Sequence, residues 1–148
     1  MSNSILTLVT FIPAIGAVLL MLMPRNDRAL RWAALIISLV AFAFSVYLPV
    51  NMGVGIAGNG FQFQTDVSWI KIGDVNIHYH LGADGISMWL TLLTTFLVPL
   101  GVLVSWKSIH DRVKEFFVLL LILESAMIGV FLSLDMFLFY VFWEATLI

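Results

Sequence analysis

Two carboxylates lie inside strongly apolar segments of this 148-residue chain. Glu144 falls within the run FLFYVFWEATLI at 137–148, and Glu124 lies near the middle of the apolar run at 116–133. An acid at the centre of a bilayer costs about 3 kcal/mol even on lenient insertion scales. Such residues usually face the protein interior and handle ions or protons. Glu144 and Glu124 therefore indicate a membrane component that translocates ions or protons.

The composition also indicates a membrane protein. Hydrophobic residues make up 61% of the chain and charged residues 11%, and the mean hydropathy is +1.06. These values lie outside the usual range for globular domains. The net charge of -2 offers no basic field for nucleic acid, so we exclude it as a partner. The absence of cysteine excludes thiolate-ligated iron–sulfur clusters, so any redox cofactor must belong to other chains.

The apolar segments predict an all-α, polytopic transmembrane helix bundle that forms a single membrane domain over 1–148. A span of about 20 residues crosses the hydrocarbon core. We expect four complete spans and a fifth that is cut at the end of the chain, at about 5–23, 32–50, 86–106, 116–134 and 135–148. No positive charge precedes the first apolar core, which favours a retained span over a cleaved signal peptide.

The lysines and arginines predict the orientation. Two of the expected loops are rich in them and contain Arg25, Arg28, Arg31, Lys107, Arg112 and Lys114. The long loop at 51–84 contains only Lys71. Because short basic loops stay in the cytoplasm, we expect the N-terminus and the 51–84 loop on the outer side.

The outer loop contains a hairpin signal. Residues 69–72 and 75–78 alternate apolar and polar side chains around Gly73 and Asp74. Glycine at the first central position suits a type II′ turn. We therefore expect a short extracytoplasmic β-hairpin, packed on helix ends or on a neighbouring subunit because a lone hairpin is marginally stable.

Other polar side chains have structural explanations. Asp135 and Asp84 each precede an expected span, where an aspartate caps the first backbone N–H groups of a helix. His78 and His80 share one face of the second expected strand, but no third metal ligand is evident. We interpret the two histidines as a polar strand edge and predict no metal site.

The two glutamates are expected at similar depth. With 133–135 as the turn between antiparallel helices, Glu124 lies ten residues before Leu134 and Glu144 ten after it. Each carboxylate is then ~15 Å below that turn. If the helix faces converge, the two buried acids could share and release a proton. Such a pair suits a proton relay, and we expect Glu144 to be its principal acid.

The alternative is that the glutamates only join helices through polar contacts. Ser125, Gly129 and Ser133 recur every four residues, a pattern that allows close approach of a neighbouring helix. Glu124 is adjacent to this small-residue face, so a packing role remains open for it more than for Glu144.

Several motifs resemble a known family. They are LGADGIS at 81–87, Glu124 followed by GVF at 129–131, and DMFLFYVFWE at 135–144. In this order and spacing they resemble the N-terminal part of the antiporter-like membrane subunits of respiratory complex I, the NADH:quinone oxidoreductase. The resemblance covers roughly the second half of the chain, and its combined motifs are far more specific than any one of them.

The resemblance implies a longer protein of about fourteen transmembrane helices with inverted repeats. It also implies that Glu144 is the fifth-helix glutamate of the family, whose partner lysine lies on the seventh helix, outside this sequence. Glu124 would be an auxiliary relay or coupling carboxylate toward a neighbouring antiporter-like subunit.

By this resemblance the chain is part of a proton-translocating subunit in the bacterial cytoplasmic membrane. It would carry no redox catalysis itself, with FMN, iron–sulfur clusters and quinone in partner subunits. Its expected partners are other membrane subunits of complex I and the lipid bilayer. A multisubunit cation/proton antiporter or a membrane-bound hydrogenase is an alternative assembly. A structural membrane scaffold, which would tolerate Glu124→Gln together with Glu144→Gln, is a third alternative.

Overall fold

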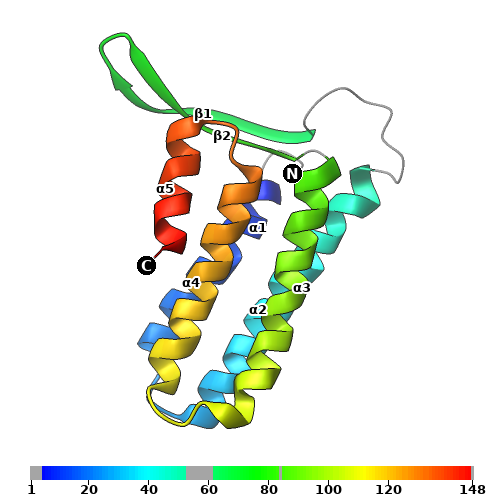
Figure 1. Ribbon diagram of the computed structural model, residues 1–148, viewed down its shortest axis with the longest axis vertical. Coiled ribbons are helices and arrows are strands. Elements are labelled where there is room, and N and C mark those ends of the chain that lie inside the picture. The colour runs from blue at the N-terminus through cyan, green and yellow to red at the C-terminus, as the bar shows by residue number, and fades with distance from the viewer. Residues whose placement is uncertain (1–4, 53–61, 84, 148) are drawn as a thin grey trace.

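The computed structural model describes residues 5–52, 62–83 and 85–147. Its elements follow the order α1 (Ile5–Leu22), α2 (Asp27–Met52), β1 (Gln62–Ile72), β2 (Val75–Ala83), α3 (Gly85–Ser108), α4 (Val113–Leu132) and α5 (Met136–Thr146). Helices α1 to α4 form an elongated bundle, the hairpin lies across one end, and α5 runs beside the adjacent half of α4 (Figure 1). This arrangement confirms a helical bundle with one β-hairpin.

All five predicted spans are helical, but they differ in length. In the described part of the chain, α2, α3 and α4 are long and apolar enough to cross a membrane. The other two, α1 and α5, are shorter apolar helices. The described structure thus provides three candidate spans and two shorter apolar helices where we had expected four full spans and a partial one.

The start of the second helix was predicted too late. Helix α2 begins at Asp27 rather than at residue 32, so Arg28 and Arg31 belong to its first turns instead of to a loop. Long basic side chains can extend from a helix toward the polar boundary, so they do not end it. Arg31 reaches the residue that follows α3, where its Nη2 donates to the carbonyl oxygen of Ile109 at 2.9 Å.

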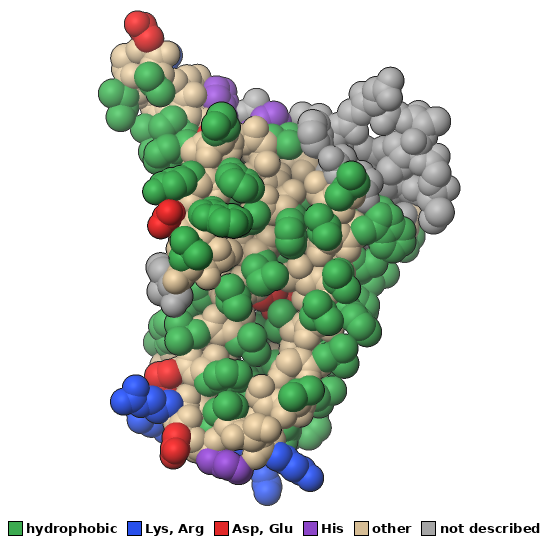
Figure 2. Space-filling view, viewed as in Figure 1, with side chains coloured by type: hydrophobic (Ala, Val, Ile, Leu, Met, Phe, Trp, Pro, Cys, Tyr) green, Lys and Arg blue, Asp and Glu red, His purple; other side chains and the backbone are tan. Residues whose placement is uncertain are grey.

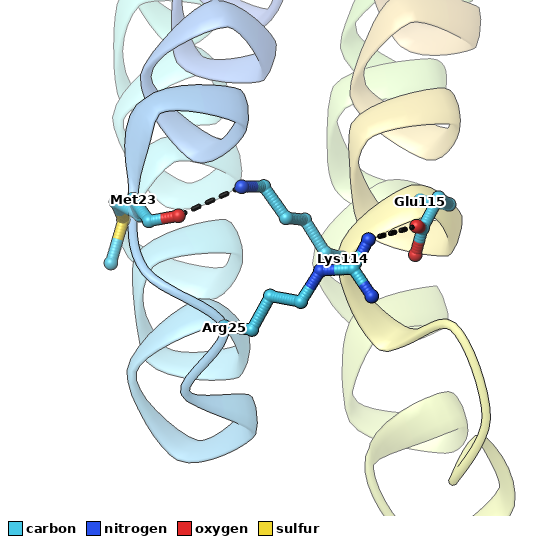
Figure 3. Close-up of polar contacts among 4 residues, drawn as sticks. All are labelled: Met23, Arg25, Lys114 and Glu115. Carbon is cyan, nitrogen blue, oxygen red and sulfur yellow. Dashed lines mark hydrogen bonds and ion pairs between the residues drawn. The ribbon is translucent and has the colours of Figure 1, made fainter.

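Basic residues gather at the end of the bundle opposite the hairpin (Figure 2). Lys114 Nζ donates to the carbonyl oxygen of Met23 at 2.8 Å, just beyond the end of α1 (Figure 3). Arg25 and Glu115 form an ion pair at 3.2 Å, with both side chains well exposed. Because the last carbonyls of a helix lack intrahelical partners, a cation there is favourable. These contacts join the loop after α1 to the first turn of α4.

The predicted hairpin is confirmed and is longer than expected. Strands β1 and β2 pair antiparallel around Gly73 and Asp74. A type II′ turn requires a positive φ at the first of its two central residues and not at the second. Gly73 has φ of 60° and Asp74 has no positive φ, so both residues meet this requirement. An isolated bridge joins Leu81 of β2 to Ser133, which follows α4. The base of the hairpin is therefore held on the turn between α4 and α5.

Most of the buried apolar side chains form two groups at different heights in the bundle. The hairpin-side cluster contains Val9, Leu81, Met88, Ile128, Leu132 and Leu138. The loop-side cluster contains Ala17, Leu20, Leu30, Ala34, Val102, Val113, Phe117, Val118 and Leu121.

Buried polar side chains lie in the middle part of the bundle. This polar layer contains Thr10, Ser38, Ser45, Thr91, Thr94, Thr95, Glu124 and Ser125. Along α4, Glu124 and Ser125 come between Leu121 of the loop-side cluster and Ile128 of the hairpin-side cluster. Helix α3 shows the same arrangement. Its three threonines lie between Met88 of the hairpin-side cluster and Val102 of the loop-side cluster. Four helices thus contribute polar groups to the same zone.

Candidate functional site: a buried carboxylate in the polar layer

Glu124 is the central group of the candidate site. Its side chain is 0% exposed, and neither carboxyl oxygen has a hydrogen-bond partner among the described residues. The buried positions one turn away on α4, Leu121 and Ile128, are both apolar. Burying a polar group without a hydrogen bond costs roughly 1–3 kcal/mol on the scale of protein mutations. A carboxyl group kept at this cost is suited to exchanging protons.

Hydroxyl groups in the same layer join pairs of helices. Ser125, next to Glu124, donates from Oγ to the carbonyl oxygen of Thr10 on α1. Between α2 and α3, the hydroxyls of Ser45 and Thr95 lie 2.7 Å apart. Glu124 thus lies within a set of hydroxyls that can donate or accept hydrogen bonds, although none of them bonds to it directly.

Glu144 lies in a different environment. It is exposed on α5, where its carboxylate is hydrogen-bonded by the side chain of Tyr140, one turn earlier. Helix α5 faces α4 with Phe142, since a Cβ added at Gly129 would collide with the Phe142 ring. Two residues correspond to about 200° of helix rotation. Glu144 therefore points away from α4, and the two glutamates do not converge within this chain.

The small-residue face of α4 does allow close packing, as its spacing predicts. Gly129 accommodates the ring of Phe142 from α5, and Ser125 bonds to α1. The small-residue face therefore contacts two neighbouring helices, α1 and α5. The third small residue, Ser133, donates its hydroxyl proton to the carbonyl oxygen of Gly129. The sequence pattern predicted the close approach but not the identity of the two partners.

The predicted cap of α5 is confirmed. Asp135 Oδ1 accepts from the backbone N–H groups of Phe137 at 2.9 Å and Leu138 at 3.3 Å. Its other oxygen accepts from the backbone N–H of His78 at 3.4 Å, which links the cap to β2. The cap proposed for Asp84 lies outside the described residues. Asp135 fixes the direction in which α5 leaves the turn, and hence where Glu144 lies.

Tyr79 is a polar residue of β2 that the sequence did not single out. Its hydroxyl lies 3.2 Å from that of Thr7 on α1, and its ring stacks near Phe11. Burial raises the pKa of Tyr79, and the hydrogen bond between Tyr79 and Thr7 partly opposes that rise. A tyrosine in an alternating strand gives no sequence signal that it is half-buried.

No group of three potential metal ligands occurs among the described residues.

Comparisons with known proteins give a consistent result. NADH-quinone oxidoreductase subunit M from Rhodobacter capsulatus is 41% identical over 151 residues, which cover 99% of this chain and 28% of that protein. NADH-ubiquinone oxidoreductase chain 4 from Arabidopsis thaliana is 39% identical over 137 residues, covering 92% of this chain and 27% of that protein. No family model matches.

The fold also resembles a solved structure. A chain of the membrane-bound sulfane sulfur reductase, an archaeal respiratory membrane complex, aligns over 94% of this chain and 21% of its own length, with a TM-score of 0.61. Its sequence identity is 18%, so this likeness concerns the fold alone.

The helices, the apolar composition and these relatives define a multi-pass membrane protein. Within that class, the chain is homologous to the N-terminal region of the antiporter-like membrane subunits of complex I, NADH-quinone oxidoreductase subunit M and NADH-ubiquinone oxidoreductase chain 4. Subunit M is also the member of the family that the sequence motifs most resemble. The chain spans a little over a quarter of the length of these relatives, 28% and 27%.

Proposed function

We propose that this chain belongs to a proton-translocating membrane subunit of a bacterial NADH:quinone oxidoreductase. The observation that carries the proposal is Glu124, a carboxyl group with 0% exposure and no partner among the described residues. A purely structural scaffold does not need a buried carboxyl group, because an apolar side chain would fill the same space at a lower free-energy cost. Proton transfer, in contrast, requires an acid whose proton occupancy depends on which groups reach it.

The two glutamates have distinct roles in this proposal. Glu144 is the principal switching acid, as the complex I motif implies, and its exposed position on α5 leaves it accessible to a basic group from the rest of a longer subunit. Glu124 is the auxiliary relay inside the bundle. Because the two do not converge within this chain, protons would pass between them through intervening groups or water.

The proposed setting is the bacterial cytoplasmic membrane, with the N-terminus and the hairpin outside. The basic residues at the opposite end of the bundle support this orientation through the positive-inside rule (Figure 2). In the membrane, α1 to α4 would be four complete crossings and α5 the first part of a fifth. FMN, iron–sulfur clusters and quinone would reside in partner subunits, and neighbouring antiporter-like subunits would be the lateral partners.

The test uses the full-length subunit in its native complex. Glu144→Gln and Glu124→Gln keep the side-chain shape but remove the ionisable proton, so each should lower NADH-driven proton uptake into membrane vesicles. We expect the larger loss for Glu144→Gln. Glu115→Gln is the matched control, since Glu115 lies on α4 but is exposed and paired with Arg25. It should pump like the wild type.

The outcomes also separate the alternatives. Normal pumping by the doubly substituted Glu124→Gln and Glu144→Gln protein would favour the scaffold. Cation-dependent proton exchange in an assembly without NADH oxidation would favour a cation/proton antiporter. Purification of the native complex with flavin and iron–sulfur subunits would support the proposed assembly.

A further inference from the structure

Thr91 on α3 shares an unusual property with Glu124. Its side chain is 0% exposed, and its hydroxyl has no hydrogen-bond partner among the described residues. The neighbouring threonines differ from it, because Thr94 donates to the carbonyl oxygen of Leu90 at 2.9 Å and Thr95 to that of Thr91 at 3.1 Å. A helical threonine ordinarily satisfies its hydroxyl in this way. The hydroxyl of Thr91 is therefore left for another partner.

Thr91 and Glu124 lie in corresponding parts of two packed helices. Helices α3 and α4 are antiparallel neighbours, and Met88 of α3 and Ile128 of α4 belong to the same hairpin-side cluster. Thr91 is three residues further along α3, about 4.5 Å toward the loop side. Glu124 is four residues back along α4, about 6 Å in the same direction. Both unpartnered groups thus occupy the polar layer about one turn below the shared cluster.

The chemistry of the two groups is complementary. A carboxyl group needs hydrogen-bond donors, and a threonine hydroxyl can donate one proton while accepting others. Buried waters typically make about three hydrogen bonds to polar groups that would otherwise be unsatisfied. Besides Thr91 and Glu124, the described residues include one other buried side-chain atom without a partner, Nε of Arg31, which lies near the start of α2.

We propose that Thr91 and Glu124 bind a shared internal water between α3 and α4. The water accepts from the Thr91 hydroxyl and donates to a carboxyl oxygen of Glu124. Thr91 is then a positioning residue, which orients the acid and holds its first water. Its importance for proton transfer rests on the proposed function, whereas the water site itself follows from the two unpartnered groups.

The network around Thr91 gives this site a fixed frame. The Thr95 hydroxyl, which donates to the Thr91 carbonyl oxygen, also lies 2.7 Å from the Ser45 hydroxyl of α2. A displacement of Thr91 would disturb these hydrogen bonds. Hydrogen bonds within α3 and between α2 and α3 therefore fix the position of the Thr91 backbone, and with it the position of the Thr91 hydroxyl.

Infrared spectroscopy of the complex containing the full-length subunit tests the proposal. The Glu124 band is the carboxyl or carboxylate signal that Glu124→Gln removes. Thr91→Val keeps the side-chain shape but loses the hydroxyl, so we expect this band to shift, while Thr91→Ser should restore the wild-type position. Ser108→Ala is the control, because Ser108 is exposed at the far end of α3 and bonds to Val104. It should leave the band unchanged.

An unshifted Glu124 band in a folded Thr91→Val protein would overturn the proposal, because the Thr91 hydroxyl would then take no part in hydrogen bonding to the acid. The result is independent of pumping. A shifted band together with normal pumping by Glu124→Gln would retain the water site and reject the transport role. An unshifted band together with impaired pumping by Glu124→Gln would reject only the role of Thr91.

Discussion

Replacing Glu124 by methionine should stabilise the subunit while impairing its function. Methionine is similar in length and adapts to irregular gaps, and it has no polar atom that needs a strong partner. The described structure gives neither Glu124 oxygen a protein partner. Relieving one unsatisfied buried polar group is worth roughly 1–3 kcal/mol. A shared water would recover part of that cost, so we expect a gain of about 1–2 kcal/mol.

This gain corresponds to about a 5- to 30-fold change in the folding equilibrium. It can be measured on the full-length subunit by unfolding in mixed micelles of mild and denaturing detergent, followed by tryptophan fluorescence. Glu115→Met is the matched control on α4. Its exposed ion pair with Arg25 spans 3.2 Å, and pairs of this kind contribute roughly 0–1 kcal/mol, so this variant should gain nothing.

The reasoning would be refuted if Glu124→Met lost stability relative to wild type while Glu115→Met did not. That result would mean that Glu124 has strong partners in the complete subunit, and that its retention needs no functional explanation. A stabilised variant with normal proton pumping would refute only the transport role.

Three further predictions concern the frame around the site. Asp135→Ala removes the cap of α5 and should lower the free energy of unfolding by about 1 kcal/mol in the same assay. The control, Asp74→Ala at the exposed hairpin turn, should leave it almost unchanged, and equal losses would contradict the capping role. Gly129→Val should push the Phe142 ring away and loosen α5, seen as faster proteolysis after α4; unchanged proteolysis would contradict the packing. Because burial raises the pKa of Tyr79, its ionisation should destabilise the fold only at alkaline pH; Tyr79→Phe should reduce that loss, as thermal unfolding against pH can show.

The sequence was sufficient for much of the architecture. Apolar runs of helical length located all five helices, and glycine before Asp74 identified the turn of the hairpin. Asp135 was recognised as a cap because an aspartate before an apolar run satisfies the first N–H groups of a helix. The start of α2 was missed, since hydropathy counts Arg28 and Arg31 as loop residues although both are helical.

The relative positions of the two acids could not be predicted. Glu124 and Glu144 have similar apolar surroundings in the sequence and similar expected depth. Their exposure depends on how each helix is rotated about its axis, which packing decides. The contact between Phe142 and Gly129 turns Glu144 outward on α5, whereas Glu124 faces the bundle. Thr91 was missed for the same reason, because its lack of a partner appears only when the helices are assembled.

The most direct test of the central claim is the number of protons translocated per NADH oxidised by the purified complex in proteoliposomes, compared between wild type and Glu124→Gln. We predict that the variant assembles, oxidises NADH and translocates fewer protons per NADH, while Glu115→Gln keeps the wild-type ratio. An unchanged ratio in a fully assembled Glu124→Gln complex would contradict the account and leave Glu124 as a packing residue.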